Sequence, residues 1–153
     1  MRVQTEDTMR LHIHSGSTIL SFTFFLLVVM LSAMPVFAGS AKINCQAHEG
    51  SCKLPIGEET ITLDITPRPV TAMQDSTFKV TITGAQPAKA PYLDLGMPAM
   101  KMGPNRVMLK SDGNGSYTGK GVIVRCKSGR RTWFANVVVP GSGEAKFVFD
   151  VVY

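Results

Sequence analysis

Residues 59–83 read ETITLDITPRPVTAMQDSTFKVTIT, which is two alternating segments on either side of a Pro-Arg-Pro tripeptide. The apolar positions of the alternation are Ile61, Leu63, Ile65, Phe78, Val80 and Ile82. A two-residue period rich in β-branched side chains is typical of strands that bury one face. The two segments are therefore expected to be strands, and Pro67 and Pro69 end the first of them because proline cannot continue the pairing.

The same alternation recurs towards the C-terminus, over residues 92–95, 107–109, 117–124, 133–139 and 147–153. Residues 112–115 read Asp-Gly-Asn-Gly, a hairpin turn signal that supplies the positive φ angles such turns need. No convincing helical stripe is present. About seven short strands separated by Gly and Pro predict an all-β, immunoglobulin-like β-sandwich, with the single Trp133 in its core.

The first residues predict export from the cytoplasm. Arg2 and Arg10 precede an apolar run at 19–31, and Val36 and Ala38 occupy the two positions that a signal peptidase reads. We expect a signal peptide over residues 1–38. The alternative is an uncleaved membrane anchor, because residues 19–38 carry no charge and about twenty apolar residues span a bilayer. Either way the expected location is periplasmic or otherwise extracytoplasmic.

The exported part divides into two regions. Residues 39–57 are polar and are expected to form an irregular arm that contains cysteines, and residues 58–153 are expected to form the sandwich. The cysteines are Cys45, Cys52 and Cys126, which allow one disulfide and one free thiol in any of three pairings. A bridge from the arm to Cys126 is favoured, because closing so long a loop contributes about 4 kcal/mol.

Few residues suit catalysis, and no enzymatic activity is expected. Only His48 of the three histidines lies outside the leader, and no Gly-x-Ser-x-Gly or phosphate-binding glycine motif is present. One histidine and three scattered cysteines do not make a zinc site. The net charge of +5 is spread along the chain, which indicates a solvated face or one that meets an anionic partner or membrane surface. Nucleic acid is not an expected partner.

An unusual segment, residues 94–105, reads DLGMPAMKMGPN and holds Met97, Met100 and Met102. Thioethers are soft ligands that suit Cu(I) and are not lost to disulfide formation. These methionines are candidate Cu(I) ligands, with Met108, Met73 or His48 completing the shell. The alternative is that they fill irregular gaps at the end of the core.

A second candidate segment is the basic turn at residues 125–131, RCKSGRR. Its positive side chains, Arg125, Lys127, Arg130 and Arg131, are candidates for binding a partner or an anion. The alternative is a solvated hairpin tip whose cysteine belongs to a structural bridge.

Several motifs in one order resemble the YtkA-like domain family. They are Pro-Arg-Pro at 67–69, Met-Pro-Ala-Met at 97–100, Pro-Asn-Arg-Val at 104–107, the Gly-Ser-Tyr strand at 115–122, and Gly129 followed by Thr132 and Trp133. The resemblance implies a small immunoglobulin-type sandwich outside the cytoplasmic membrane. It also implies copper handling during oxidase or cation-pump assembly, as for the related FixH-type membrane-anchored accessories.

The sequence therefore predicts a periplasmic copper-binding or metalloprotein-assembly accessory. Its expected cofactor is Cu(I), its expected partner is an envelope metal-transport or oxidase-assembly protein, and it touches the membrane only through an uncleaved N-terminal segment. The alternative is a metal-free module that binds an envelope protein through the methionine segment or the basic turn.

Overall fold

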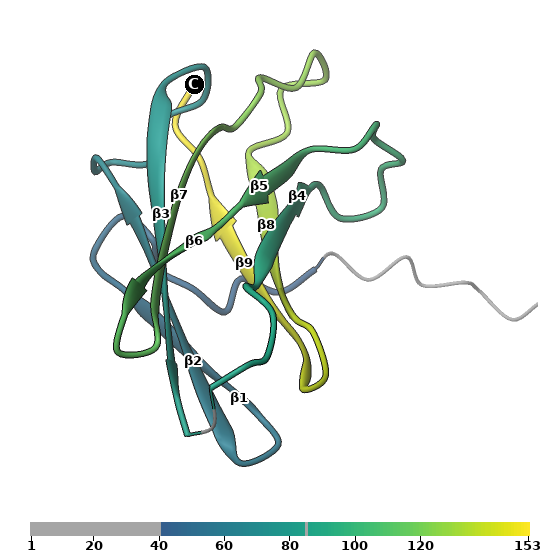
Figure 1. Cartoon of the computed structure of the whole chain (residues 1–153). Helices are drawn as coiled ribbons and strands as arrows, with labels where there is room; N and C mark the ends of the chain where they lie inside the picture. The colour runs from purple at the N-terminus through teal and green to yellow at the C-terminus, as the bar shows by residue number, and fades with distance from the viewer. Residues whose placement is uncertain (1–40, 85) are drawn as a thin grey trace, which may run out of the picture. The chain divides into compact units, whose positions relative to one another are not determined.

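The computed structural model describes residues 41–84 and 86–153, which form nine β-strands in two antiparallel sheets (Figure 1). The expected all-β sandwich is confirmed, with nine strands in place of about seven. The expected leader, residues 1–38, lies outside the described residues. Within the described ranges, no helix has the length and hydropathy needed to cross a membrane.

The five-stranded sheet has the order β1-β2-β3-β7-β6, with β1 at Cys52–Ile56, β2 at Glu59–Thr66, β3 at Asp75–Thr83, β7 at Ser116–Val122 and β6 at Lys110–Gly113. The four-stranded sheet has the order β5-β4-β8-β9, with β5 at Arg106–Met108, β4 at Tyr92–Gly96, β8 at Thr132–Val139 and β9 at Gly143–Asp150.

The inward faces of the two sheets make one hydrophobic core. Buried residues alternate with half-buried ones along β2 and β8, as a strand with one covered face requires. Phe78, Trp133 and Phe147 are fully buried, so the expected core position of Trp133 is confirmed. Burial of one such side chain contributes about 1.5–3 kcal/mol, as does burial of each large aliphatic side chain of the core.

The strands that the sequence pattern did not reveal, β1 and β6, are the two edges of the five-stranded sheet. The β1 strand lies within residues 39–57, where an irregular arm was expected, and it contains Pro55, which an edge strand tolerates. All four residues of β6 are exposed, so this strand has no apolar alternation to find.

The chain changes sheets between β5 and β6, and at this crossing it lies against β7. A Cβ atom built on Gly119 would stand 2.6 Å from the carbonyl oxygen of Met108, and one built on Gly121 would stand 2.5 Å from Cγ2 of Val107. Neither distance is compatible with a side chain. The two glycines therefore let the crossing segment pack directly on the backbone of β7.

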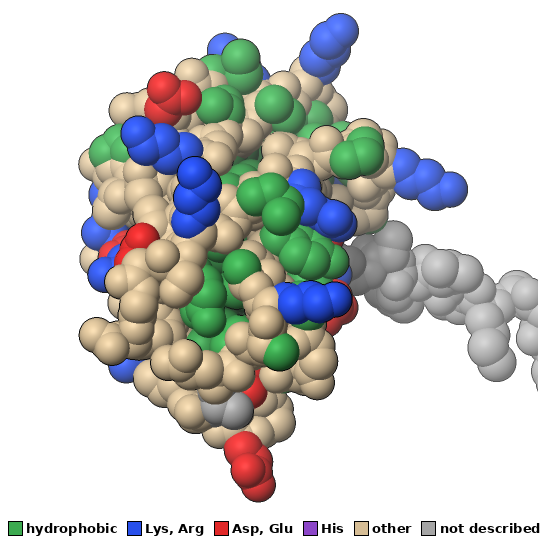
Figure 2. All heavy atoms as spheres, viewed as in Figure 1, with side chains coloured by type: hydrophobic (Ala, Val, Ile, Leu, Met, Phe, Trp, Pro, Cys, Tyr) green, Lys and Arg blue, Asp and Glu red, His purple; other side chains and the backbone are tan. Residues whose placement is uncertain are grey.

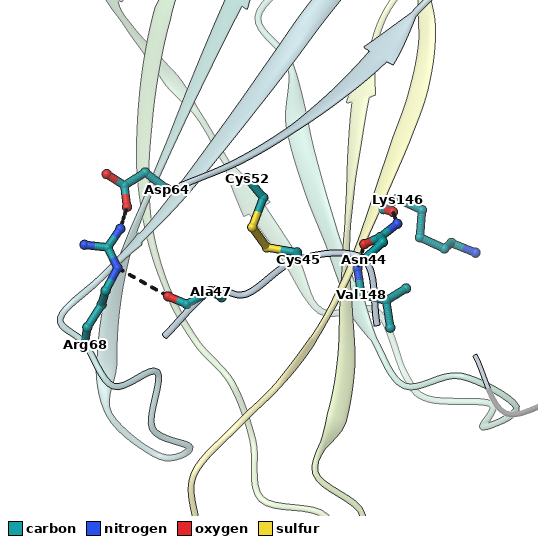
Figure 3. Close-up of a disulfide and its surroundings, with 8 residues drawn as sticks. All are labelled: Asn44, Cys45, Ala47, Cys52, Asp64, Arg68, Lys146 and Val148. Atoms are coloured by element: carbon teal, nitrogen blue, oxygen red, sulfur yellow. Dashed lines mark hydrogen bonds and ion pairs between the residues drawn. A yellow bond between two sulfur atoms is a disulfide. The ribbon is translucent and has the colours of Figure 1, made fainter. Parts of the chain in front are cut away.

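The N-terminal arm closes the other side of the sandwich, between the edge strands β9 and β1 (Figure 3). The backbone N–H groups of Asn44 and Cys45 donate to the carbonyl oxygen of Val148 at 3.1 and 3.0 Å. The Asn44 side chain accepts from the Val148 N–H at 2.7 Å and donates to the Lys146 carbonyl at 3.0 Å. These bonds satisfy edge groups of β9 that would otherwise face solvent.

The disulfide joins Cys45 to Cys52, so the expected bridge from the arm to Cys126 is wrong. The amide N–H groups of Glu49 and Gly50 donate to the Gln46 carbonyl, and this turn brings the Cα atoms of the two bridged cysteines to 5.4 Å. Proximity of the backbones, rather than the length of the closed loop, decides the pairing. A loop this short contributes about 2–3 kcal/mol by the loop-closure relation.

We expect Gly119→Ala to lower the free energy of unfolding by about 1–3 kcal/mol, because the new methyl group would force the crossing segment away from β7. Urea denaturation followed by Trp133 fluorescence measures this loss. Gly103→Ala is the matched control, since a Cβ at Gly103 would meet no atom within 4 Å. Equal losses in the two variants would contradict the close-approach explanation.

Candidate functional site

Three chain connections meet at one end of the sandwich, the upper end in Figure 1. Antiparallel pairing of Gly96 with Phe134 places the last residue of β4 beside the start of β8, so residues 97–105 begin next to residues 123–131. The side chain of Asn105 also donates to the Val122 carbonyl at 3.5 Å. We call residues 67–74, 97–105, 123–131 and Tyr153 the loop end.

The methionines expected to bind copper differ in burial and lie in different parts of the fold. Met97 is 2% exposed and belongs to the core, whereas Met100 and Met102 are half-buried and pack against the core from residues 97–105. Met108 is 65% exposed but lies on β5, directly opposite Tyr92 of β4. Of Met97, Met100, Met102 and Met108, only Met100 and Met102 are therefore both at the loop end and accessible.

A third accessible thioether reaches the loop end from the β2–β3 connection. Met73 is 68% exposed, and its Sδ accepts a hydrogen bond from the Arg125 amide at 3.4 Å. His48 lies against the same connection, where its Nδ1 accepts from the Val70 amide at 3.1 Å. In the neutral ring this makes Nε2 the N–H donor, so the bond to Val70 leaves His48 without a free lone pair for a metal. Within the described ranges, no group of three or more His, Cys, Asp or Glu side chains could hold a metal ion.

The basic turn is held by the hydroxyl of Tyr153. This hydroxyl donates to the Arg130 carbonyl, and it accepts from the Cys126 amide at 3.1 Å and from Trp133 Nε1 at 3.5 Å. The Arg125 guanidinium lies 5.5 Å from the centroid of the Tyr153 ring. The turn therefore has a defined conformation that Tyr153 and the buried Trp133 both support.

The positive side chains of this turn, Arg125, Lys127, Arg130 and Arg131, are all exposed. The two ion pairs found in residues 41–84 and 86–153 are Arg68–Asp64 and Arg106–Asp94, and neither uses a cation of the turn. Four uncompensated charges on one ordered turn make a local positive potential that attracts anionic groups.

Cys126 is the free thiol of the described chain and is half-buried in the basic turn. Its Sγ lies 3.0 Å from Oγ of Ser128. Hydrogen bonding by Ser128 is the main cause that lowers the pKa of the thiol below its ordinary value, and the backbone and charge of Arg130 lower that pKa further. A thiolate is the reactive form of cysteine, so this side chain is suited to reaction with electrophiles.

The outer face of the four-stranded sheet carries a surface that the sequence reasoning missed. Arg106 donates to both carboxylate oxygens of Asp94, at 2.8 and 3.1 Å, and its guanidinium stands 4.0 Å from the centroid of the Tyr92 ring. Figure 2 shows hydrophobic and basic side chains next to one another over β4 and β5. Asp94 and Arg106 are twelve residues apart in the sequence, and they come together because they are paired across β4 and β5. The sequence alone does not give this pairing, so the surface could not be predicted from it.

Comparison of the chain with protein-family models, with curated proteins and with solved structures gives no match. The likeness to the YtkA-like family accordingly stays a prediction from the sequence motifs.

We expect Ser128→Ala to shift the alkylation of Cys126 by iodoacetamide to higher pH, because the thiolate loses the hydrogen bond that lowers its pKa. The measurement is the rate of alkylation as a function of pH. Without reductant the Cys45–Cys52 disulfide stays intact, so only the Cys126 thiol reacts. Ser111→Ala, on the exposed strand β6, is the control and should leave the profile in place. Overlapping profiles for all three proteins would rule out Ser128 as the cause.

Proposed function

We propose that this domain is an extracytoplasmic binding module that docks on an acidic surface of a partner protein through its loop end. The carrying observation is the basic turn, in which the Tyr153 hydroxyl fixes the backbone while four cations remain exposed and outside the ion pairs of the described chain.

An ordered turn supports binding because less conformational entropy is lost when a partner is engaged. Its uncompensated charges speed the encounter with an acidic surface and favour such partners over basic ones. Met100 and Met102 beside the turn supply adaptable apolar contacts, and arginine and methionine are both enriched in protein interfaces. Arg106, held by Asp94 and Tyr92, extends this surface onto β5.

The proposed location rests on the cysteines and the leader. The Cys45–Cys52 disulfide is a bond typical of an oxidising compartment outside the cytoplasm. The positively charged and apolar pattern of residues 1–38 supports export in the same direction. An immunoglobulin-like architecture and a YtkA-like role beside an envelope oxidase-assembly or metal-transport protein are the finer parts of this proposal, and the motifs quoted above support them.

The test uses an acidic polypeptide, poly-glutamate, as the probe of the loop end. We expect the amide resonances of residues 123–131 to shift on titration. Neutralising the four cations of the turn to Gln should weaken binding at least about tenfold. The matched control neutralises Lys53, Lys79, Lys110 and Lys120, which are exposed on the five-stranded sheet and change the net charge equally.

Two results would overturn the docking proposal. Equal weakening by both sets of substitutions would show that only overall charge matters. Binding to vesicles of anionic lipid that the turn variant loses, with no binding of poly-glutamate, would assign the turn to a membrane surface instead.

A second candidate function is Cu(I) binding, and one observation favours it. Met73, Met100 and Met102 all lie at the loop end with exposed or half-buried side chains, so two of its connections supply three soft ligands. Sulfur ligands of this kind select Cu(I). The revised ligand set replaces Met97, which lies in the core, with Met73.

We expect anaerobic competition against a chromogenic Cu(I) chelator to show one bound copper that is lost when Met73, Met100 and Met102 are all changed to Leu. This swap nearly conserves volume and should spare the fold. Met108→Leu, on β5, is the control and should bind as the unchanged protein does. Absence of binding, or equal binding by the triple variant, would eliminate this candidate.

A further inference from the structure

Four large apolar side chains are exposed in residues 41–84 and 86–153, and three of them belong to segments that meet beside the basic turn. These three are Met73, which is 68% exposed, and Val124 and Val152, which are each 40% exposed. Single apolar residues are ordinary on a protein surface, whereas apolar residues grouped beside charged ones are typical of an interaction site. We call Met73, Val124 and Val152 the apolar patch.

Met73 is held against the chain on both sides of Val124. Its backbone N–H donates to the Ile123 carbonyl at 2.8 Å, and its Sδ accepts from the Arg125 amide at 3.4 Å. The side chain of Met73 therefore lies along the backbone at Val124. Met73 also has a positive φ of 61°, which a residue with a Cβ atom rarely adopts and which is found most often at binding and active sites.

The C-terminal segment brings Val152 to the same place. The Val152 N–H donates to the Val70 carbonyl, and the Ala72 N–H donates to the Val152 carbonyl, both at 2.9 Å. Val152 therefore lies beside the residues that immediately precede Met73. The ring of the next residue, Tyr153, stands 5.5 Å from the Arg125 guanidinium, so the apolar patch and the cations of the turn are neighbours.

The two kinds of side chain at this place indicate what binds there. The cations of the basic turn attract carboxylates, and the apolar patch gains free energy only when another apolar group covers it. A protein segment that carries an aliphatic side chain among acidic residues satisfies both requirements at once. Interfaces between proteins combine apolar contacts with complementary charges in this way.

A membrane of anionic lipid matches this surface less well. Proteins that lie on membranes insert Trp, Phe or Leu side chains, and none of these is among the exposed large apolar side chains of the described ranges. Asp75 is exposed at the start of β3, two residues after Met73, and a flat anionic surface would repel it. A peptide avoids this repulsion because it can direct its carboxylates to the basic turn.

We propose that the apolar patch binds an aliphatic side chain of the partner segment whose acidic residues contact the basic turn. This inference rests on the docking function proposed above and adds the chemistry of the partner to it. The partner is then recognised by an aliphatic residue flanked by carboxylates rather than by negative charge alone.

The test compares two acidic heptapeptides that differ only at the central position, which is leucine in one and serine in the other, with glutamate at the remaining six. Each is titrated into the protein, with a metal chelator present, while the amide resonances are followed. We expect the leucine peptide to bind about fivefold to tenfold more tightly, because it buries its side chain on the apolar patch. Both peptides should shift residues 125–131, and only the leucine peptide should shift residues 72–74, 124 and 152.

Substitutions at Met73 assign this preference to the apolar patch. Met73→Gln should abolish the preference for leucine and leave the affinity for the serine peptide unchanged. Met73→Leu should keep the preference, which separates apolar contact from the chemistry of the thioether. Met108→Gln is the matched control, since Met108 is 65% exposed but lies on β5, and it should also keep the preference.

A second variant guards against disturbance of the Met73 backbone. Val124→Thr leaves both hydrogen bonds of Met73 in place, because these use the backbones of Ile123 and Arg125, and it should reduce the preference about twofold.

The possible failures are distinguishable. Equal affinity for the two peptides, with poly-glutamate still bound, would overturn the apolar contact and leave the docking function standing. No binding of either peptide or of poly-glutamate would overturn both. A preference that Met73→Gln and Met108→Gln reduce equally would also overturn the proposal. So would binding to vesicles of anionic lipid that Met73→Gln loses, without any preference for the leucine peptide, since the patch would then meet a lipid surface.

Discussion

The crossing of the chain from one sheet to the other depends on two glycines of β7. Gly119 and Gly121 present bare backbone to Val107 and Met108, and this close approach fixes where β5 ends and β6 begins. Residues 97–105 are tied to this crossing, because they end at β5 and hydrogen-bond to the last residue of β7 through Asn105. The position of the methionine segment therefore depends on this crossing as well as on Met97, which is buried in the core.

The opposite side of the sandwich is closed by different chemistry. There the arm supplies hydrogen bonds to β9 through Asn44 and a covalent bond to β1 through Cys45, while Arg68 Nε donates to the Ala47 carbonyl at 3.3 Å (Figure 3). The two sheets are thus held together by close packing on one side and by a stapled arm on the other. The arm occupies edge groups of β9, which protects that edge from pairing with other chains.

Much of this fold can be read from the sequence, because β2, β3 and β8 each bury one face and so alternate strictly, whereas β9 ends in a buried run at 147–149. The pattern fails where burial does not alternate, as in β6, which is exposed throughout. The direction of a loop side chain is also not encoded locally. Met97 and Met100 sit in one short loop, yet the first is buried and the second is not, because Ala99 takes a positive φ of 56° and turns the chain between them.

The pairing of the cysteines could not be predicted from the sequence either. The entropy of loop closure ranks possible bridges by length and favours Cys126, but a bridge also needs two backbones already side by side. Here the arm turns back at Gln46 and meets β1 within a few residues, so Cys45 pairs with Cys52. Cys126 is left as a free thiol that is hydrogen-bonded to Ser128.

The placement of charge has one more consequence. Arg125, Lys127, Arg130 and Arg131 stand at one end of the sandwich, and Glu58, Glu59 and Glu144 stand around the turns at the other. The domain is therefore an electric dipole along its strands, and a charged neighbour exerts a torque on it before contact. Near an acidic surface it rotates until the basic turn leads, which leaves the carboxylate end pointing outward and accessible to a second molecule.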